Sequence, residues 1–220
     1  MQILGLIPAR GGSRGTSGKN LAPLAGKPLL AWTIEAAQAS RTLTRIVVST
    51  DSDEIAALAR ELGTETLARP PELAAGDTPM LQVVRHGLAE LPCDVLVLLQ
   101  PTSPLRRAEH VDGAVRVLLD TGADCVVSVV EVPHQFRPGS LMALDAGRLA
   151  RLAPLSSARR QDKPVVYARN GPAVLALRPE RLGEDLYGGD CRPYVMDVRD
   201  SVDVDTPFEL ELAEFLLAWR

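Results

Sequence analysis

The sequence predicts a single α/β domain built on a mainly parallel sheet with helices on both faces. Apolar runs of strand length alternate along the chain with longer segments of helical period. The predicted strands are continuously apolar, which is typical of parallel strands that are buried on both faces. The chain has 220 residues, of which 46% are hydrophobic, enough to bury one full core.

Strands and helices alternate regularly in the first half of the chain. Pro28 suits the start of the first helix, and Ser52 can cap the second, which Gly63 ends. Asp77 is the expected cap of the third helix. Strands are expected at 3–7, 45–50 and 94–99, and helices at 29–39, 53–62 and 78–91.

The second half keeps this pattern at its two ends and interrupts it in the middle. We expect a helix at 109–119, strands at 125–130 and 194–198, and a last helix at 206–219. Between Val132 and Asn170, prolines and glycines punctuate short segments. The leucines there supply too much apolar surface for a disordered linker. We therefore expect one domain, 1–220, in which 132–170 is a dimerisation extension and the protein is a homodimer.

The bulk composition excludes several classes of protein. The net charge of −4 argues against a nucleic-acid or anionic-membrane partner. Cys93, Cys125 and Cys191 lie far apart and suggest neither a disulfide framework nor a zinc site. No signal peptide and no apolar run of membrane-spanning length is visible, so we expect a cytoplasmic protein.

A glycine-rich loop from Ile7 to Asn20 follows the first strand. Its glycines let backbone amides crowd into an anion-binding concavity, which Arg10, Arg14 and Lys19 can reinforce with charge. The loop lacks the Gly-Lys-Ser/Thr ending of a P-loop and does not contain the dinucleotide fingerprint Gly-x-Gly-x-x-Gly. The sequence therefore predicts a phosphate site, with a plain surface turn as the alternative.

Further polar groups follow two later strands at the same predicted sheet edge. Gln100, Ser103 and Arg106 offer amide, hydroxyl and guanidinium groups that suit a sugar or a base. Asp203 and Asp205 are oxygen ligands of the kind that Mg²⁺ prefers beside phosphate. Capping of the last helix is the alternative for Asp205. Both carboxylates together, near a phosphate loop, favour a magnesium site.

The ordered set of motifs resembles the acylneuraminate cytidylyltransferase family, also called the CMP-sialic acid synthetases. The resemblance covers nearly the whole chain and is most specific at the glycine-rich loop and at the segment from Arg69 to Ala74. The motifs are Ile-Pro-Ala-Arg-Gly-Gly-Ser-Arg-Gly-x-x-Gly-Lys-Asn from Ile7, Gly26-Lys27-Pro28-Leu29, Ser49-Thr50-Asp51, Arg69-Pro70-x-Glu72-Leu73-Ala74, Gln100-Pro101-Thr102-Ser103-Pro104-Leu105-Arg106 and Asp203-Val204-Asp205.

This resemblance implies a Rossmann-like nucleotidyltransferase that transfers CMP from CTP to a nonulosonic acid sugar and releases pyrophosphate. It further implies a homodimer whose arms reach the partner's site. By the same likeness, Arg10 and Lys19 would hold the triphosphate, and Asn20 and Arg69 would contact ribose and base. Asp203 and Asp205 would bind Mg²⁺, with Arg10, Lys19 and Asp203 forming the catalytic set. The residues expected to face the sugar acid are Gln100, Arg160 and Asn170.

Departures from the family pattern leave the substrate open. Arg14 stands where the family commonly has a lysine, and Val174 where it often has a tyrosine. The segment from Leu182 to Asp190 lacks a pair of phenylalanines that would pack on an acyl group. The alternatives are a transferase for another base or another sugar acid, such as an octulosonate, and a non-enzymatic sugar-nucleotide-binding protein.

Overall fold

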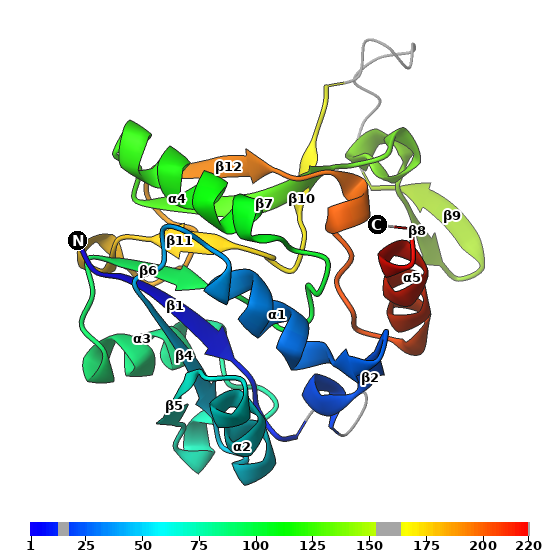
Figure 1. Cartoon of the computed structure of the whole chain (residues 1–220). Coiled ribbons are helices and arrows are strands. Elements are labelled where there is room, and N and C mark those ends of the chain that lie inside the picture. Colours follow the sequence, from blue (N-terminus) through cyan, green and yellow to red (C-terminus); the bar gives the residue numbers. More distant parts are fainter. Residues whose placement is uncertain (13–17, 153–163, 220) are drawn as a thin grey trace.

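The computed structural model describes residues 1–12, 18–152 and 164–219, and its centre is an eight-stranded sheet (Figure 1). The strands follow the order β10-β7-β11-β6-β1-β4-β5, and β12 also pairs with β7. Their bounds are β1 (Ile3–Pro8), β4 (Arg45–Thr50), β5 (Glu65–Ala68), β6 (Val95–Leu98), β7 (Cys125–Glu131), β10 (Tyr167–Arg169), β11 (Leu175–Leu177) and β12 (Cys191–Val195).

The sheet is mainly parallel, as the sequence predicts. β1 pairs in parallel with both β4 and β6, β4 with β5, and β7 with β12. Two strands run the other way, because β11 lies antiparallel between β6 and β7, and β10 is antiparallel to β7. Each of these two strands has only three residues, too few for hydrophobic periodicity to reveal them.

Helices cover both faces of the sheet. The side chains of β1 alternate between the faces, with Ile3 and Ile7 on one and Leu4 and Leu6 on the other. On the first face lie α1 (Leu29–Gln38), α2 (Asp53–Glu61) and α4 (Ala108–Thr121), and on the second α3 (Met80–Glu90). The last helix, α5 (Pro207–Leu217), packs through Ala213 against a hairpin made of β2 (Pro23–Leu24) and β3 (Lys27–Pro28).

Of the two helix caps predicted at Ser52 and Asp77, one is confirmed and the other is wrong. Ser52 caps α2 by accepting a hydrogen bond from the backbone amide of Ile55 at 3.4 Å, as predicted. The cap predicted at Asp77 is wrong, because α3 begins at Met80 after Pro79 and no side chain caps it. The ring of Pro79 disfavours a helical conformation for the preceding residue, so the helix starts beyond it.

The return strand near the end of the chain is displaced from its predicted position. It spans Cys191–Val195 rather than 194–198. The backbone amide of Met196 makes a last bond to the Val129 carbonyl, at 2.8 Å. Asp197 then caps a 3-10 turn at Val198–Asp200 by accepting from the amide of Arg199, which draws the chain out of the sheet.

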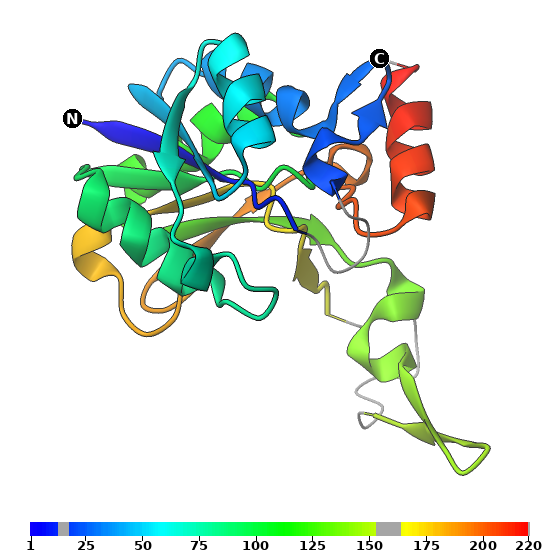
Figure 2. The ribbon, with the colours of Figure 1, turned by 90° about the horizontal axis from the view of Figure 1, so that it is seen from below.

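The extension after β7 projects from the body of the molecule (Figure 2). Its described part contains a separate hairpin of β8 (Met142–Asp145) and β9 (Arg148–Arg151). Leu144 and Leu149 on this hairpin are 74% and 65% exposed. The chain rejoins the sheet at β10, slightly before the expected end of the extension at Asn170, while residues 153–163 lie outside the described part.

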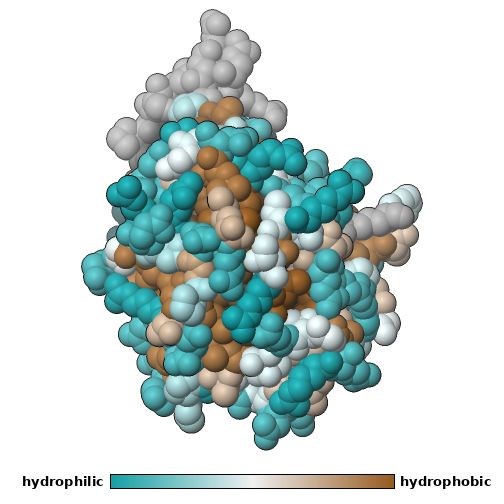
Figure 3. Space-filling view, turned by 60° about the vertical axis from the view of Figure 1, so that its left-hand side comes forward, coloured by the Kyte–Doolittle hydropathy of each residue, from teal (hydrophilic) through white to brown (hydrophobic). Residues whose placement is uncertain are grey.

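The surface and the helices carry two further observations. On the face shown in Figure 3, hydrophobic residues form patches between hydrophilic ones. Among the helices in the described ranges, none combines the length and the apolar composition that crossing a membrane requires.

Candidate active site

The polar segments singled out in the sequence meet at one edge of the sheet. The parallel strands β1, β4, β5 and β6 all end there, each followed by one of these segments. Because β11 runs antiparallel to β6, the residues that precede it, 170–174, lie at the same edge. The fold thus brings the glycine-rich loop, the segment after β6 and the connection before β11 together.

The two described ends of the glycine-rich loop are tied down. The side-chain amide of Asn20 donates to the carbonyl of Arg10 at 3.0 Å, which joins the two ends. The amide of Gly11 donates to the Asp51 carboxylate at 3.0 Å. The Arg10 guanidinium reaches the carbonyl of Ala74 at 3.5 Å, across the sheet edge. Arg14 belongs to the residues 13–17, outside the described part.

Lys19 links this loop to the pair of aspartates near the end of the chain. Its Nζ lies 2.8 Å from Oδ1 of Asp205, whose side chain is 73% exposed, whereas that of Lys19 is 14% exposed. The amide of Val204, between the two aspartates, donates to the carbonyl of Thr102 at 2.7 Å. The aspartate segment is therefore held beside the segment that follows β6, and the ammonium of Lys19 contacts it at Asp205.

Asp203 is a partly buried carboxylate with charges of both signs nearby. Burial raises its pKa, and the charge of Asp205 adds to this rise, whereas a hydrogen bond from Thr102 and the charge of Lys19 oppose it. Its Oδ1 is buried and has no hydrogen-bond partner among the described residues. A buried carboxylate oxygen without a partner is costly unless something outside the protein chain satisfies it.

Asp203 and Asp205 fit a Mg²⁺ ion on this ground. In the described part of the chain, no group of three or more histidine, cysteine or acidic side chains is placed to hold a metal. Mg²⁺ commonly uses one or two carboxylates and completes its shell with water and substrate phosphate. A pair of carboxylates beside a cationic, glycine-rich loop provides that partial shell.

Arg69 lies buried where β5 ends. Its guanidinium donates to the hydroxyl of Ser49 at 3.2 Å and to the carbonyl of the same residue at 2.8 Å. Burial lowers the pKa of Arg69 to about 10, which Asp51 opposes and Arg10 reinforces. Arg69 therefore remains a cation at neutral pH.

Gln100 and Ser103 contact the connection that precedes β11. Gln100 donates to the carbonyl of Gly171 at 3.0 Å, and the Ser103 hydroxyl reaches the carbonyl of Asn170 at 3.5 Å. Gly171 has φ +116°, and a Cβ there would lie 2.8 Å from Oγ of Ser103 and 3.3 Å from Oδ1 of Asp203. Glycine is thus required both by the backbone conformation and by the close approach.

Arg106 and Asn170 are buried among protein partners. The Arg106 guanidinium donates to the carbonyls of Gln100 and Ala173 at 3.0 and 2.8 Å, and burial lowers its pKa to about 9. The Asn170 carboxamide accepts from Ser128 and the amide of Ala173, and donates to Ser201 and to the sulfur of Met196. Arg106 thus links the segment after β6 to the connection before β11, and Asn170 links that connection to the segment after β12. Arg160 lies outside the described residues.

Two contributors near the site are absent from the sequence-based set. Arg107 and Asp200 form an ion pair at 3.0 Å. Arg107 directly follows Arg106 in the chain, and Asp200 lies three residues before Asp203. Asp200 is 7% exposed. In the sequence, Arg107 could have been singled out because it stands next to Arg106, a predicted site residue. Its pairing with Asp200 could not be predicted, because the two residues lie far apart in the chain.

Comparison with known proteins agrees with this arrangement. A family model described as cytidylyltransferase matches residues 4–208. The chain is 34% identical over 217 residues to an N-acylneuraminate cytidylyltransferase of Escherichia coli O18:K1:H7, covering 96% of this chain and 51% of that protein. It is 34% identical over 227 residues to a CMP-N,N'-diacetyllegionaminic acid synthase of Legionella pneumophila, covering 99% and 97% respectively. The chain thus spans about half of the first relative and nearly all of the second.

Solved structures bear on the fold alone. A CMP:2-keto-3-deoxy-manno-octonic acid synthetase complexed with CTP superposes with a TM-score of 0.75 at 18% identity, covering 100% of this chain and 99% of that one. A cytidylyltransferase of Leptospira borgpetersenii gives 0.62 at 17% identity, covering 100% and 88%. They confirm the Rossmann-like sheet, and the family match and the sequence relatives confirm the resemblance found in the motifs. The chain belongs to the cytidylyltransferase family.

Proposed function

We propose that this protein transfers CMP from CTP to the anomeric hydroxyl of a sialic-acid-like nonulosonate and releases pyrophosphate. The observation that carries the proposal is the convergence of Lys19, Asp203 and Asp205 at the sheet edge where the glycine-rich loop begins. Cations and a divalent metal site beside a phosphate loop supply what attack on a phosphate requires. The names of the E. coli and Legionella relatives support the substrate class.

In this proposal the cations bind and stabilise the triphosphate. Arg10 and Lys19 hold the phosphates, and Arg14 lies in the same loop. Attack on the α-phosphorus builds charge on its equatorial oxygens and on the departing pyrophosphate, so the ammonium of Lys19 contributes most at the transition state. Asn20 and Arg69 are assigned to ribose and base. Their bonds to Arg10 and Ser49 fix them beside the loop.

Mg²⁺ is the proposed cofactor, held by Asp203 and Asp205. When bound, it would neutralise charge on the phosphates and on the leaving pyrophosphate. The Oδ1 atom of Asp203, buried without a partner, supports this assignment. Asp205 is bound to Lys19 in the protein alone. We propose that Lys19 exchanges this carboxylate for a phosphate oxygen when Asp205 takes the cation.

The sugar acid is proposed to lie near Gln100, Ser103 and the 170–174 connection. Gln100 and Ser103 contact that connection directly. Arg160 remains a proposed contact. Arg106 and Asn170 contribute in this proposal by fixing the wall of the site, through the bonds of Arg106 to Gln100 and Ala173 and of Asn170 to Ser201. The Nε and Nη2 atoms of Arg106 are buried without a partner among the described residues. The two segments that differ from the family pattern, around Val174 and 182–190, leave the sugar to be identified by experiment.

A homodimer is part of the proposal. The exposed leucines of the β8–β9 hairpin form an apolar surface on a projecting arm, which is a liability for a monomer. A second apolar surface is formed by Val198, Phe215 and Trp219, which are 62%, 57% and 78% exposed. Burial of such surfaces against a twofold mate would remove both from water. We also propose a cytoplasmic location, which the three free cysteines support.

A pyrophosphate-release screen tests the function. CTP, UTP, GTP and ATP are each combined with neuraminic, legionaminic, pseudaminic and octulosonic acids in the presence of Mg²⁺. The proposal predicts release that requires CTP and a nine-carbon acid together. If octulosonic acid is the only acid that supports release, the substrate is an eight-carbon sugar acid instead. Binding of CTP without turnover on any acid would favour a binding protein.

A further inference from the structure

The segment between β12 and α5, residues 196–206, carries the aspartate pair but has almost no regular structure. It contains one 3-10 turn, Val198–Asp200, and lies outside the ladder of the sheet except for the bond made by Met196. Yet Asp203 and Asp205 must be held in a defined position, because Mg²⁺ requires a nearly ideal octahedral shell. The segment must therefore be fixed by contacts at and around the aspartates.

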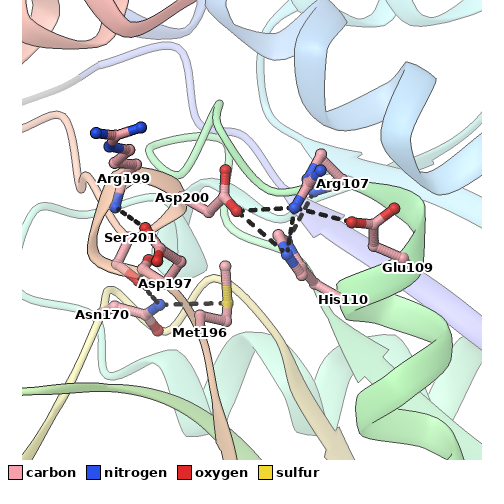
Figure 4. Close-up of polar contacts among 9 residues, drawn as sticks. All are labelled: Arg107, Glu109, His110, Asn170, Met196, Asp197, Arg199, Asp200 and Ser201. Carbon is pink, nitrogen blue, oxygen red and sulfur yellow. Dashed lines mark hydrogen bonds and ion pairs between the residues drawn. The ribbon is translucent and has the colours of Figure 1, made fainter. Parts of the chain in front are cut away.

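Between the two aspartates the segment is fixed by backbone and core contacts. The amide of Val204 is bonded to Thr102, and its side chain is 2% exposed in the cluster that packs α5. The upstream side is fixed by Asp200 and Ser201. Asp200 contacts Arg107 and His110, both at the first turn of α4, while Ser201 accepts from Asn170 at 3.0 Å (Figure 4).

The contact at Asp200 is the stronger of these upstream anchors. Its Oδ2 lies 3.0 Å from the Arg107 guanidinium and 3.5 Å from Nε2 of His110. The Asp200 side chain is 11% exposed, so the pair is shielded from water more than a surface ion pair. Arg107 is held in turn by Glu109 at 2.8 Å. The carboxylate is thus fixed by groups that belong to a rigid helix.

We propose that Asp200, held by Arg107, is a positioning residue for the Asp203–Asp205 metal site. The contact transmits the position of the first turn of α4 to the carboxylates three and five residues further along the chain. Groups that orient metal ligands without touching the metal commonly change its affinity about 10- to 100-fold when they are removed. The proposal rests on the proposed function, because it concerns the metal that the function requires.

The chain offers a closely matched control for the arginine. Arg85 pairs with Glu184 at 3.0 Å, and its side chain is 48% exposed. Arg107 pairs with Asp200 at the same distance and has the same exposed fraction. The two guanidiniums differ in what they hold, since Glu184 is 93% exposed and lies on a different segment. Arg85→Gln therefore removes a guanidinium of matched exposure and ion-pair distance that pairs with a carboxylate remote in sequence from the aspartates.

The test compares Asp200→Asn and Arg107→Gln with Arg85→Gln and the wild type. Mn²⁺ is titrated into each protein with CTP present, and bound metal is measured from water-proton relaxation. The Mg²⁺ concentration for half-maximal turnover and the thermal midpoint are measured in parallel. We expect Mn²⁺ affinity to fall about tenfold in Asp200→Asn and several-fold in Arg107→Gln, with a matching rise in the Mg²⁺ requirement. Arg85→Gln should bind as the wild type does.

The possible failures are distinguishable. If Asp200→Asn does not fold, Arg107→Gln still decides, because its side chain is half exposed and its loss leaves the core intact. Lower thermal midpoints with unchanged metal affinity would show a purely structural contact and overturn the inference. A wild-type protein that neither binds Mn²⁺ with CTP nor transfers CMP would instead overturn the proposed function.

Discussion

Lys19 and Asp205 are 186 residues apart in sequence, yet their side chains are joined by a 2.8 Å ion pair. The pair closes the candidate site by linking the first loop of the sheet to the segment before the last helix. It also joins the cation to which we assign phosphate binding and the carboxylate to which we assign metal binding.

Lys19→Ala should lower kcat more than it raises KM for CTP. The reason is that the ammonium is proposed to stabilise charge that develops in the transition state. Lys27→Ala is the control, since Lys27 pairs with Glu35 on α1 and contacts Trp32, away from the loop. Steady-state kinetics at saturating Mg²⁺ provides the measurement. A raised KM with unchanged kcat would reassign Lys19 to ground-state binding.

Asp203→Asn should reduce turnover on the order of 10²-fold or more while the fold is kept. The amide is nearly isosteric with the carboxylate but removes the charge that is proposed to hold Mg²⁺. Asp205→Asn should act in the same direction. Turnover is measured across Mg²⁺ concentrations, and circular dichroism checks the fold. Near wild-type turnover at low Mg²⁺ in either variant would show that its carboxylate does not hold the metal.

The sequence predicted most of the sheet because its central strands are long and continuously apolar. It did not predict β5, β10 or β11, since three or four residues show no clear period, and the pairing of β10 and β11 depends on strands far away in the chain. The same limit applies to the site. Residue chemistry indicated Lys19 and the aspartates, whereas the roles of Arg106 and Asn170 depend on contacts with Ala173 and Ser201 that no local pattern reveals.

Gly171→Ala should impair the site more than an ordinary glycine substitution. Its φ of +116° is unfavourable for alanine, and the new Cβ would meet Ser103 and Asp203. Strain of this kind costs about 1–3 kcal/mol of stability. Gly63→Ala is the control, because Gly63 also has positive φ but has no atom near the new Cβ. We expect both variants to lose stability in thermal unfolding and only Gly171→Ala to lose kcat/KM. An equal kinetic effect in both would contradict the close approach.

Deletion of residues 138–152 should produce a monomer with reduced activity. The deletion removes the β8–β9 hairpin and its exposed leucines, which we propose to be buried in the dimer. Sedimentation at micromolar concentration measures the assembly before and after the deletion. A wild-type protein that is monomeric and fully active would eliminate the proposed interface. An active monomer after the deletion would show that the arm is dispensable for catalysis.

The central claim is that this protein joins a cytidylyl group to a sugar acid at the Lys19–Asp203–Asp205 site. The most direct measurement is phosphorus NMR of a reaction with CTP, Mg²⁺ and a nonulosonic acid. We predict that a phosphodiester resonance and a pyrophosphate resonance grow in equal amounts with the wild type, and that both are nearly absent with Asp203→Asn. Release of pyrophosphate together with free CMP, or phosphodiester formation that is undiminished in Asp203→Asn, would contradict the account.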